Sequence, residues 1–234
     1  MKNSIFSFKH FSLEQSGAPQ KIGTDAVLLG AWVSLDGSER EILDVGTGTG
    51  VIAMQLAFRS SNAFVTGIDI SAEAIACASK NFASSAFSQR MYAECVSYQD
   101  FMSKKRYDLI VSNPPYFPCS TPSNKHHREI SRNNDFLPFD SLDSRTRELL
   151  SENGRFALIL PVREYSLFLS KTLMFPIREC FVSSLEGHLP IRVMAEFSMQ
   201  AHVRYPSQQL SIHDTDGNYT EAYRNLTKDF YLAF

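Results

Sequence analysis

Cysteine is scarce in this chain, and its spacing matches neither a metal site nor a disulfide framework. The 234 residues include four cysteines, with no C-x-x-C pair and no histidine at zinc-finger spacing. We therefore expect reduced thiols in the core or at the surface, and we predict no metal ion. The cysteines are Cys77, Cys95, Cys119 and Cys180.

The sequence also lacks long hydrophobic runs and a large excess of charge of one sign. Residues 1–6 do not form the apolar segment of a signal peptide, and no stretch of about 18 residues or more is free of polar groups. These absences predict a soluble, cytoplasmic protein that does not enter a membrane. The formal net charge of −2 excludes a protein whose whole surface coats nucleic acid, so any contact with a polyanion must be a local patch.

The residues that are present suit one large domain with a full core, because 44% of the 234 residues are hydrophobic. Short apolar runs that predict buried strands alternate with segments whose apolar residues have helical spacing. This pattern predicts an α/β fold with a mostly parallel sheet and helices on both faces. We expect strands at residues 41–45, 64–68, 91–96, 108–112 and 154–160, and helices at 51–57, 71–82 and 139–150.

Two later segments, residues 178–183 and 193–199, predict strands that form an antiparallel edge of the sheet. No internal repeat divides the chain. We predict a single domain over residues 1–234, with an N-terminal lid segment at 1–38, a core at 39–205 and a C-terminal segment at 206–234.

Distinctive motifs follow the first four predicted strands, at the edge where a parallel α/β sheet binds its ligands. Residues 44–50, D-V-G-T-G-T-G, follow the first strand, and their glycines allow the backbone to pass close beneath a ligand. Asp69 ends the second strand, where it suits the hydroxyls of a ribose. Asp100 and Phe101 follow the third strand and together suit an adenine, with the carboxylate on its amine and the ring stacked on its face.

The spacing of the glycines distinguishes two kinds of cofactor loop. The dehydrogenase fingerprint is G-x-G-x-x-G, whereas here the third glycine, Gly50, comes one position early and Val51 follows it. A G-x-G-x-G loop after an acidic residue instead resembles the S-adenosylmethionine loop of class I methyltransferases.

The fourth motif is Asn-Pro-Pro-Tyr at residues 113–116. Both prolines lack a backbone N–H, so the Pro114 carbonyl stays free as an acceptor beside the side-chain oxygen of Asn113. These two acceptors suit a planar NH2 group, and the Tyr116 ring offers a face for stacking. The tetrapeptide alone also fits an ordinary strand end, but its place as the fourth motif of the series favours amine binding.

Several segments resemble those of a known family, namely residues 6–9, 21–32, 43–50, 68–70, 113–117 and 226–232. The chain is similar to class I S-adenosylmethionine-dependent methyltransferases of the N-P-P-Y branch, and most similar to the bacterial tRNA1(Val) (adenine-37-N(6))-methyltransferase family. The resemblance implies a Rossmann-like fold and S-adenosylmethionine as the cofactor. It also implies tRNA as the partner, with the exocyclic amine of adenosine-37, next to the anticodon, as the methyl acceptor.

The motifs and the resemblance together assign residues to roles. The expected catalytic residues are Asn113, Pro114 and Tyr116. The expected cofactor-binding residues are Lys21, Gly23, Thr24, Asp25, Asp44, Gly46, Thr47, Gly48, Gly50, Asp69, Ile70, Asp100, Phe101 and Asn113. The expected RNA-binding residues are Pro115, Tyr116, Phe117, Lys125, Arg128 and Arg132.

Two segments allow two interpretations each. Residues 21–32 form either a lid helix over the methionine part of the cofactor or an amphipathic helix, capped by Thr24 or Asp25, that only packs on the core. The basic cluster within residues 125–132 either grips RNA phosphates or forms a solvated loop. The family is expected to have a histidine after Arg132, whereas this chain has Asn133.

Three other functions share some of these features. A protein-glutamine methyltransferase has the same tetrapeptide but typically an extra N-terminal helical domain, for which the roughly 35 residues before the first strand leave no room. An rRNA guanine amino-methyltransferase has the same fold and chemistry, and substrate assays separate it from the tRNA enzyme. A non-catalytic module that binds RNA or cofactor is disfavoured by the intact tetrapeptide.

Overall fold

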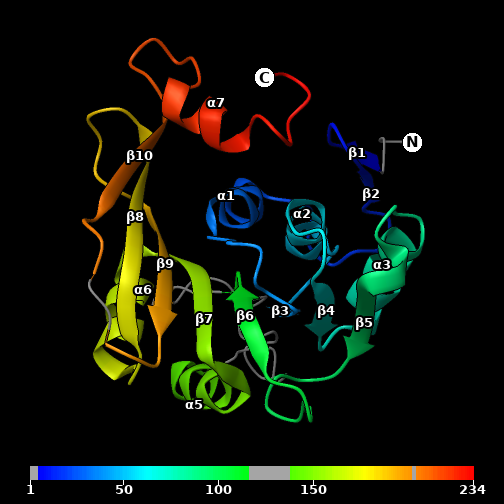
Figure 1. Ribbon diagram of the computed structural model, residues 1–234. Helices are drawn as coiled ribbons and strands as arrows, with labels where there is room; N and C mark the ends of the chain where they lie inside the picture. The colour runs from blue at the N-terminus through cyan, green and yellow to red at the C-terminus, as the bar shows by residue number, and fades with distance from the viewer. Residues whose placement is uncertain (1–4, 116–137, 202–203) are drawn as a thin grey trace, which may run out of the picture.

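A computed structural model describes residues 5–115, 138–201 and 204–234. In these residues, eight strands form a central sheet in the order β10-β8-β9-β7-β6-β3-β4-β5, and helices cover both of its faces (Figure 1). The strands are β3 (Glu41–Val45), β4 (Phe64–Asp69), β5 (Met91–Cys95), β6 (Tyr107–Ser112), β7 (Leu150–Pro161), β8 (Phe175–Leu185), β9 (Arg192–Ser198) and β10 (Gln208–His213).

Neighbouring strands are parallel except at β9, which runs antiparallel to both β7 and β8. The predicted mostly parallel sheet is confirmed, and so is the antiparallel pair of β8 and β9. Their predicted place at the edge is wrong, because β10 lies outside β8 and parallel to it. Among the six residues of β10 only Leu210 is buried, so its sequence has no apolar run that predicts a strand.

Successive residues of the central strands face opposite sides of the sheet, and both sides are buried. Ile42 of β3 belongs to a core shared with α1 (Thr24–Trp32), α2 (Val51–Arg59) and α3 (Ala72–Ala83). The next residue, Leu43, belongs to a second core under α5 (Phe139–Leu149) and α6 (Val162–Lys171) on the other face. Figure 1 shows α1 and α2 above the sheet and α5 below it. Burial on both faces explains why these strands read as continuous apolar runs.

Helix α1 belongs to the first core. It begins at Thr24 with Gly23 as its N-cap and no side-chain cap, so the expected cap by Thr24 or Asp25 is wrong. All residues from Ala26 to Trp32 are buried, and the helix packs against α2, α7 and β7. The predicted start of α3 is confirmed, because Ser71 caps it by accepting a hydrogen bond from the backbone N–H of Ala74 at 3.2 Å. The division into lid, core and C-terminal segments stays a prediction.

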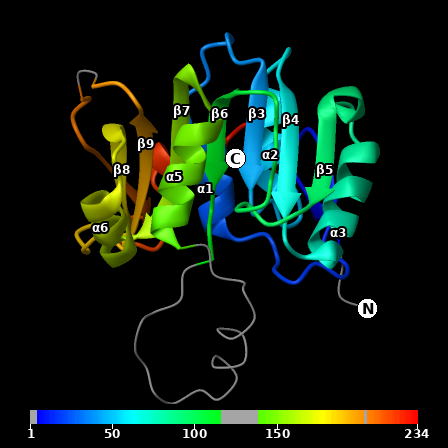
Figure 2. The same ribbon diagram turned by 90° about the horizontal axis from the view of Figure 1, so that it is seen from below.

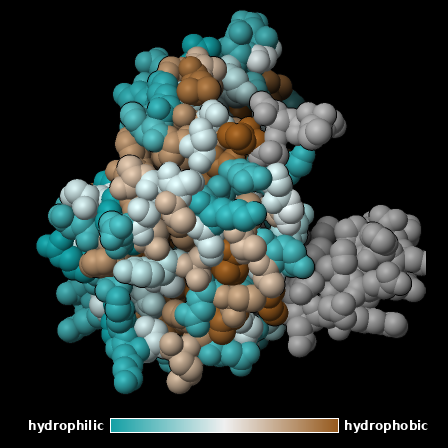
Figure 3. Space-filling model, turned by 90° about the vertical axis from the view of Figure 1, so that its right-hand side faces the viewer, coloured by the Kyte–Doolittle hydropathy of each residue, from teal (hydrophilic) through white to brown (hydrophobic). Residues whose placement is uncertain are grey.

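The two ends of the described chain lie side by side. β1 (Ile5–Ser7) and β2 (Ser12–Glu14) form an antiparallel hairpin, and α7 (Glu221–Thr227) packs against β10 and α1. The backbone N–H of Lys9 donates to the carbonyl of Phe230 at 2.9 Å, and the ring centroids of Phe8 and Phe230 are 6.3 Å apart. A short 3-10 helix, Ser88–Arg90, precedes β5, which is the edge strand at the other side of the sheet from β10. Figure 3 shows that on this side of the molecule the hydrophobic residues occur in separate small groups.

A single buried side chain joins the hairpin, α3 and the glycine-rich loop. Asn81 is 3% exposed, and its Oδ1 accepts a hydrogen bond from the N–H of Glu14 at 2.8 Å. Its Nδ2 donates to the carbonyls of Glu14 at 3.0 Å and Thr49 at 2.8 Å. Replacing Asn81 therefore leaves three backbone groups on two segments without this partner.

We predict that Asn81→Ala lowers the free energy of unfolding by about 2–3 kcal/mol, because buried polar groups lose their hydrogen bonds. Urea denaturation measures the change. The matched control is Asn225→Ala on the exposed face of α7, which should change stability by less than about 0.5 kcal/mol. Equally small effects of both substitutions would show that the hydrogen bonds of Asn81 contribute little to stability.

Candidate active site

The order of the strands reverses between β3 and β6. The chain passes from β3 to β4 and β5 in one direction and then returns to place β6 on the other side of β3. At such a reversal the loops that follow the two central strands separate and leave a crevice at the carboxyl ends. A cavity of about 540 Å³ lies there. Figure 2 shows β3 and β4 pointing toward the edge along which the segment before α1 also runs.

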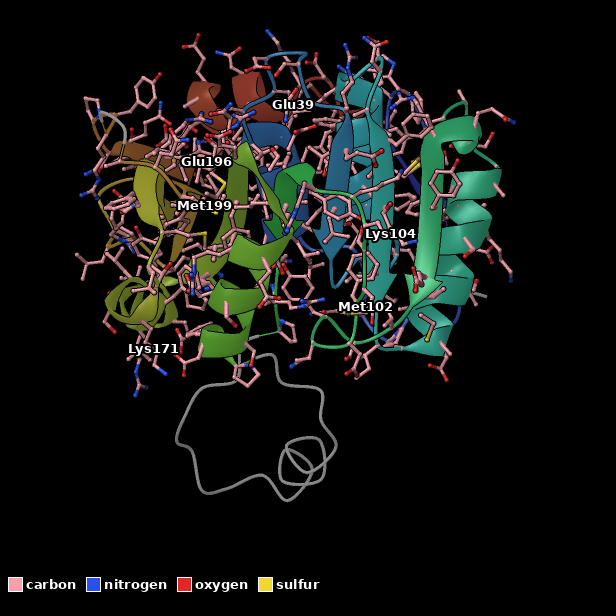
Figure 4. The ribbon with its side chains drawn as sticks, turned by 60° about the horizontal axis from the view of Figure 1, so that its bottom comes forward. Glu39, Met102, Lys104, Lys171, Glu196 and Met199 are labelled. Atoms are coloured by element: carbon pink, nitrogen blue, oxygen red, sulfur yellow. The ribbon has the colours of Figure 1, made fainter. Side chains whose placement is uncertain are left out.

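The parallel strands begin at the end of the sheet that lies opposite the cavity, and a buried ion pair is found there. Glu39, just before β3, is buried, pairs with Arg155 and accepts a hydrogen bond from the N–H of Asp36 at 3.1 Å. Figure 4 shows Glu39 at this edge and Met102, which follows β5, toward the other. The motifs that follow the strands are therefore separated from this ion pair by the length of the strands.

Seven of the predicted site residues line the cavity. They come from the ends of β3, β4 and β6, so three motifs spread over residues 46–115 meet at one place. These residues are Gly46, Gly48, Asp69, Ile70, Asn113, Pro114 and Pro115.

The glycine-rich loop is held in left-handed conformations that favour glycine. Gly46 and Gly48 have φ values of 74° and 56°, and a Cβ atom at either position would meet no atom within 4 Å. The N–H groups of Gly46 and Thr47 both donate to the carbonyl of Ile68 at 2.9 Å. The loop is thus fixed to β4 on one side and leaves open space above its two glycines on the other.

Asp69 holds the loop from the end of β4. Its Oδ2 accepts a hydrogen bond from the N–H of Gly48 at 2.9 Å, and its Oδ1 accepts one from the N–H of Ser71 at 2.9 Å. Each carboxylate oxygen has a further lone pair for a ligand, since a carboxylate offers about four acceptor positions. Asp69 is therefore able to shape the loop and to accept from hydroxyl groups in the cavity.

Three other predicted residues support the loop and do not line the cavity. Asp44 is fully buried beneath it, and its Oδ2 accepts from the hydroxyl of Thr47 at 2.7 Å and the N–H of Ala53 at 3.2 Å. Gly50 is the N-cap of α2 with φ 83°, and a Cβ atom there would lie 2.4 Å from the ring of Phe82. The sequence motif therefore combines lining residues with residues that fix them from below.

The other oxygen of Asp44, Oδ1, is buried and has no hydrogen-bond partner among the residues that the structure describes. Burial is the largest cause that raises the pKa of this carboxyl group from 3.8 to about 7; the neighbouring charge of Asp69 also raises the pKa, whereas the hydrogen bonds from Thr47 and Ala53 lower it. An ionised Asp44 thus favours a positively charged group nearby.

After β5, the structure places different residues in the cavity from those expected. Val96, Ser97, Tyr98 and Gln99 line it, whereas Asp100 and Phe101 do not. The N–H groups of Asp100 and Phe101 both donate to the carbonyl of Ser97, and this turn directs the Phe101 ring into the second core, where it is 3% exposed and packs near Tyr107.

The residues before α1 show a similar shift. Pro19 and Gln20 line the cavity, but Gly23 and Thr24 line a separate one. The exposed Lys21 lines neither, and Asp25 Oδ2 accepts from Arg192 Nε at 2.8 Å.

At the end of β6, the hydroxyl of Ser112 donates to the carbonyl of Val45 at 2.9 Å and joins the two strands that flank the crevice. Asn113, Pro114 and Pro115 follow it along the cavity wall. The remaining predicted residues, Tyr116, Phe117, Lys125, Arg128 and Arg132, lie outside the described part of the chain.

Sequence reasoning missed twelve lining residues. The pair Ser71 and Glu73 at the start of α3 carried a signal, because a capping residue directly after the strand end must lie at the same edge. A signal was also present at the last residues of four predicted strands, Val45, Ile68, Val96 and Ser112, because these strands end at that edge. The others have no sequence pattern of their own. The missed residues are Pro19, Gln20, Val45, Ile68, Ser71, Glu73, Ala74, Val96, Ser97, Tyr98, Gln99 and Ser112.

The lining also selects the charge of the ligand. Asp69 and Glu73 provide carboxylates, and none of the described lining residues is a lysine or arginine. Such a cavity disfavours the phosphates of a dinucleotide and favours a neutral or positively charged ligand that carries hydroxyl groups.

The chain is similar to known proteins along its whole length. Residues 21–133 match the family described as methyltransferase small domain. Proteins of Porphyromonas gingivalis and Pedobacter heparinus are each 39% identical to this chain, which they cover completely, and the matches span 97% and 100% of their own lengths. Both are named tRNA1(Val) (adenine(37)-N6)-methyltransferase, as is a Pasteurella multocida protein with 37% identity over 100% of this chain and 99% of its own length. The chain belongs to this methyltransferase family.

Solved structures show that the methyltransferase has the class I fold expected from the sequence. A predicted O-methyltransferase from Agrobacterium tumefaciens superposes with a TM-score of 0.70 at 19% identity, covering 88% of this chain and 96% of its own. A glycopeptide N-methyltransferase complexed with S-adenosyl-L-methionine gives 0.55 at 14% identity, covering 77% and 90%. Over the described residues, we find no helix long and apolar enough to cross a membrane and no cluster of potential metal ligands.

The raised pKa of Asp44 predicts how the stability of this methyltransferase depends on pH. Because the folded state holds the proton up to about pH 7 and the unfolded state releases it near 3.8, the stability contributed by protonated Asp44 is lost progressively as pH rises from 3.8 to about 7. Relative to Asp44→Asn, which cannot ionise, the unaltered protein should lose about 2–3 kcal/mol between pH 5 and pH 8. Urea unfolding of both proteins at the two pH values measures this difference.

The exposed substitution Asp216→Asn serves as the control and should shift stability little at either pH. A constant difference between the unaltered protein and Asp44→Asn across this range would contradict the assignment of a buried, poorly solvated carboxyl group.

Proposed function

We propose that this methyltransferase transfers a methyl group from S-adenosylmethionine to the exocyclic amine of adenosine-37 in tRNA1(Val). The observation that carries the proposal is the meeting of Asn113 and Pro114 with the glycine loop and Asp69 in one cavity. The names of relatives that align over the full chain support the substrate. With tRNA as its substrate, the methyltransferase is proposed to act in the cytoplasm.

The cavity fits the proposed cofactor. Gly46 and Gly48 leave room for a ligand above the loop, and Asp69 retains lone pairs for the hydroxyls of its ribose. The unpartnered Oδ1 of Asp44 and the absence of lysine and arginine from the described lining suit a cation. When bound, S-adenosylmethionine supplies a methyl group on a positively charged sulfur.

Asn113 and Pro114 are proposed to hold the acceptor amine. The nitrogen lone pair of adenine is delocalised into the ring, which makes the amine a poor nucleophile. The side-chain oxygen of Asn113 and the carbonyl of Pro114 each accept one N–H, which favours a pyramidal nitrogen and aims its lone pair. They also stabilise the positive charge that the nitrogen gains, and its extra proton is lost to water afterwards.

Residues of the segment that follows β6 are proposed to contact the RNA. Tyr116 and Phe117 are proposed to stack on the adenine once it has left its stack in the RNA. Lys125, Arg128 and Arg132 are proposed to contact phosphates near the target base. These local contacts account for RNA binding by a chain whose net charge is −2.

The proposal is tested with labelled S-adenosylmethionine and transcribed tRNA1(Val), followed by nucleoside analysis. We expect N(6)-methyladenosine in the transcript and none in a transcript with guanosine at position 37. Labelling of rRNA guanine or of protein glutamine, with unlabelled tRNA, would replace the proposal with one of the other amine acceptors.

We predict that Asn113→Ala lowers turnover by about 100-fold or more, because one of the two acceptors that orient the amine is lost. Binding of the cofactor, measured by calorimetry, should stay within about threefold. The control is Asn153→Ala at an exposed position of β7, which should leave both values unchanged. Parallel losses of turnover and cofactor binding would mean that Asn113 has a structural role.

We predict that Gly48→Ala weakens cofactor binding by about tenfold or more, because the new Cβ enters the space proposed for the ligand. Gly37→Ala is a matched control, since Gly37 also has positive φ and no atom within 4 Å of a Cβ, but lies in the turn before β3. Both variants should lose a similar stability of about 1 kcal/mol from backbone strain. Equal cofactor binding by the two variants would place the ligand elsewhere.

A further inference from the structure

A second cavity, of about 450 Å³, lies where the two ends of the described chain meet. Its walls come from β1, the residues just before α1, the end of β10 and residues 219–234. Gly23 and Thr24, which the sequence assigned to the cofactor, line this cavity. Its volume lies in the range of pockets that take small ligands.

The cavity wall contains a column of stacked aromatic rings. The centroids of His213 and Tyr219 are 4.8 Å apart with 27° between their planes, and those of Tyr219 and Tyr223 are 5.1 Å apart with 13°. Tyr231 extends the column beyond Tyr223 at 6.3 Å and 29°. Tyr223 is buried, whereas 42% of Tyr219 is exposed, so the column runs from the interior to the surface.

Contacts around the column hold its rings in place. His213 Nδ1 lies 3.1 Å from the carbonyl of Ser184, which fixes the plane of the imidazole. The ring of Phe234 meets Tyr219 edge-on, with centroids 5.1 Å apart. Rings that are held before a ligand arrives lose little further freedom on binding.

The lining selects a neutral, planar ligand. None of the described residues that line this cavity is Asp, Glu, Lys or Arg. Burial raises the pKa of the Tyr223 hydroxyl, and its hydrogen bond with Tyr231 raises it further, so the hydroxyl stays uncharged. Flat aromatic faces without charge are the surfaces on which proteins stack unpaired nucleobases.

The position of the cavity relates it to the active site. Gln20 lines the active-site cavity, and Ile22, two residues later, lines the aromatic cavity. The Cα atoms of residues two positions apart are at most about 7 Å from one another. One segment of chain therefore separates the two cavities, and both are within reach of nearby nucleotides of one RNA strand.

We propose that the aromatic cavity binds an unpaired base of the RNA substrate close to the methylated adenosine, by stacking it on His213, the end ring of the column, on the face opposite Tyr219. This inference rests on the proposed function, because it assigns the base to the same RNA. A base held there fixes the direction in which the strand crosses residues 19–24 and so guides the target nucleotide into the active-site cavity.

The test compares His213→Ala with His213→Phe in steady-state methylation of the anticodon stem-loop of tRNA1(Val). Loss of the ring should raise KM for the RNA about tenfold while kcat and the KM for S-adenosylmethionine stay unchanged. The phenylalanine variant should retain the original KM, because it keeps the stacking face. Tyr205→Ala, which removes an exposed tyrosine outside the cavity, is the control.

Tyr219→Ala, which removes the ring that stacks behind His213, gives a second test that leaves His213 itself unaltered. Methylation at position 37 with an unchanged KM for RNA in both alanine variants would overturn the inference and leave the proposed function intact. If the stem-loop is not methylated at all, the proposed function fails. Fluorescence anisotropy with the same labelled RNA then decides the inference: weaker binding by both variants supports it, and equal binding overturns it.

Discussion

The hydrogen bonds that Asp69 accepts from the N–H groups of Gly48 and Ser71 determine the shape of the active site. Through one carboxylate they join the glycine loop after β3 to the turn that starts α3. The reversal of strand order opens a crevice beside this junction. On the other side of the crevice, the hydroxyl of Ser112 donates a hydrogen bond to the carbonyl of Val45 at the end of β3. A side chain that suits a ribose is therefore also the one that shapes the loop beneath it.

Residues beneath the glycine loop hold it in place, although their own arrangement lowers the stability of the folded protein. Asp44 is buried with one unpartnered oxygen, which is an unfavourable arrangement in a folded protein. Gly50 fits only because it has no Cβ beside the Phe82 ring, and Asn81 ties the same loop to the hairpin. When Asp44 is ionised, its charge and the carboxylates of the lining suit a cationic cofactor. These unfavourable features lie directly beneath the loop on which the ligand is proposed to lie, so binding explains them.

The sequence predicts most of the sheet, because β3, β4 and β6 are buried on both faces and therefore carry continuous apolar runs. It misses β10, since only Leu210 is buried there, and it misses the hairpin for the same reason, with Leu13 as the one buried residue of β2. The motifs identify lining residues wherever they directly follow a strand. The expected place of Phe101 in the cavity is wrong, because a turn closed by the Ser97 carbonyl directs its ring into the core. Pro19 and Gln20 reach the site only through tertiary packing, which no local pattern records.

The central claim is that this methyltransferase modifies the amine of adenosine-37 in tRNA1(Val) with acceptors supplied by Asn113 and Pro114. The most direct measurement uses a bacterial strain that lacks this modification and expresses either the unaltered protein or Asn113→Ala. Purified tRNA1(Val) is then digested and analysed by mass spectrometry. The account predicts N(6)-methyladenosine at position 37 with the unaltered protein and unmodified adenosine with the variant. An unmodified position 37 in cells that contain the folded, unaltered protein would contradict it.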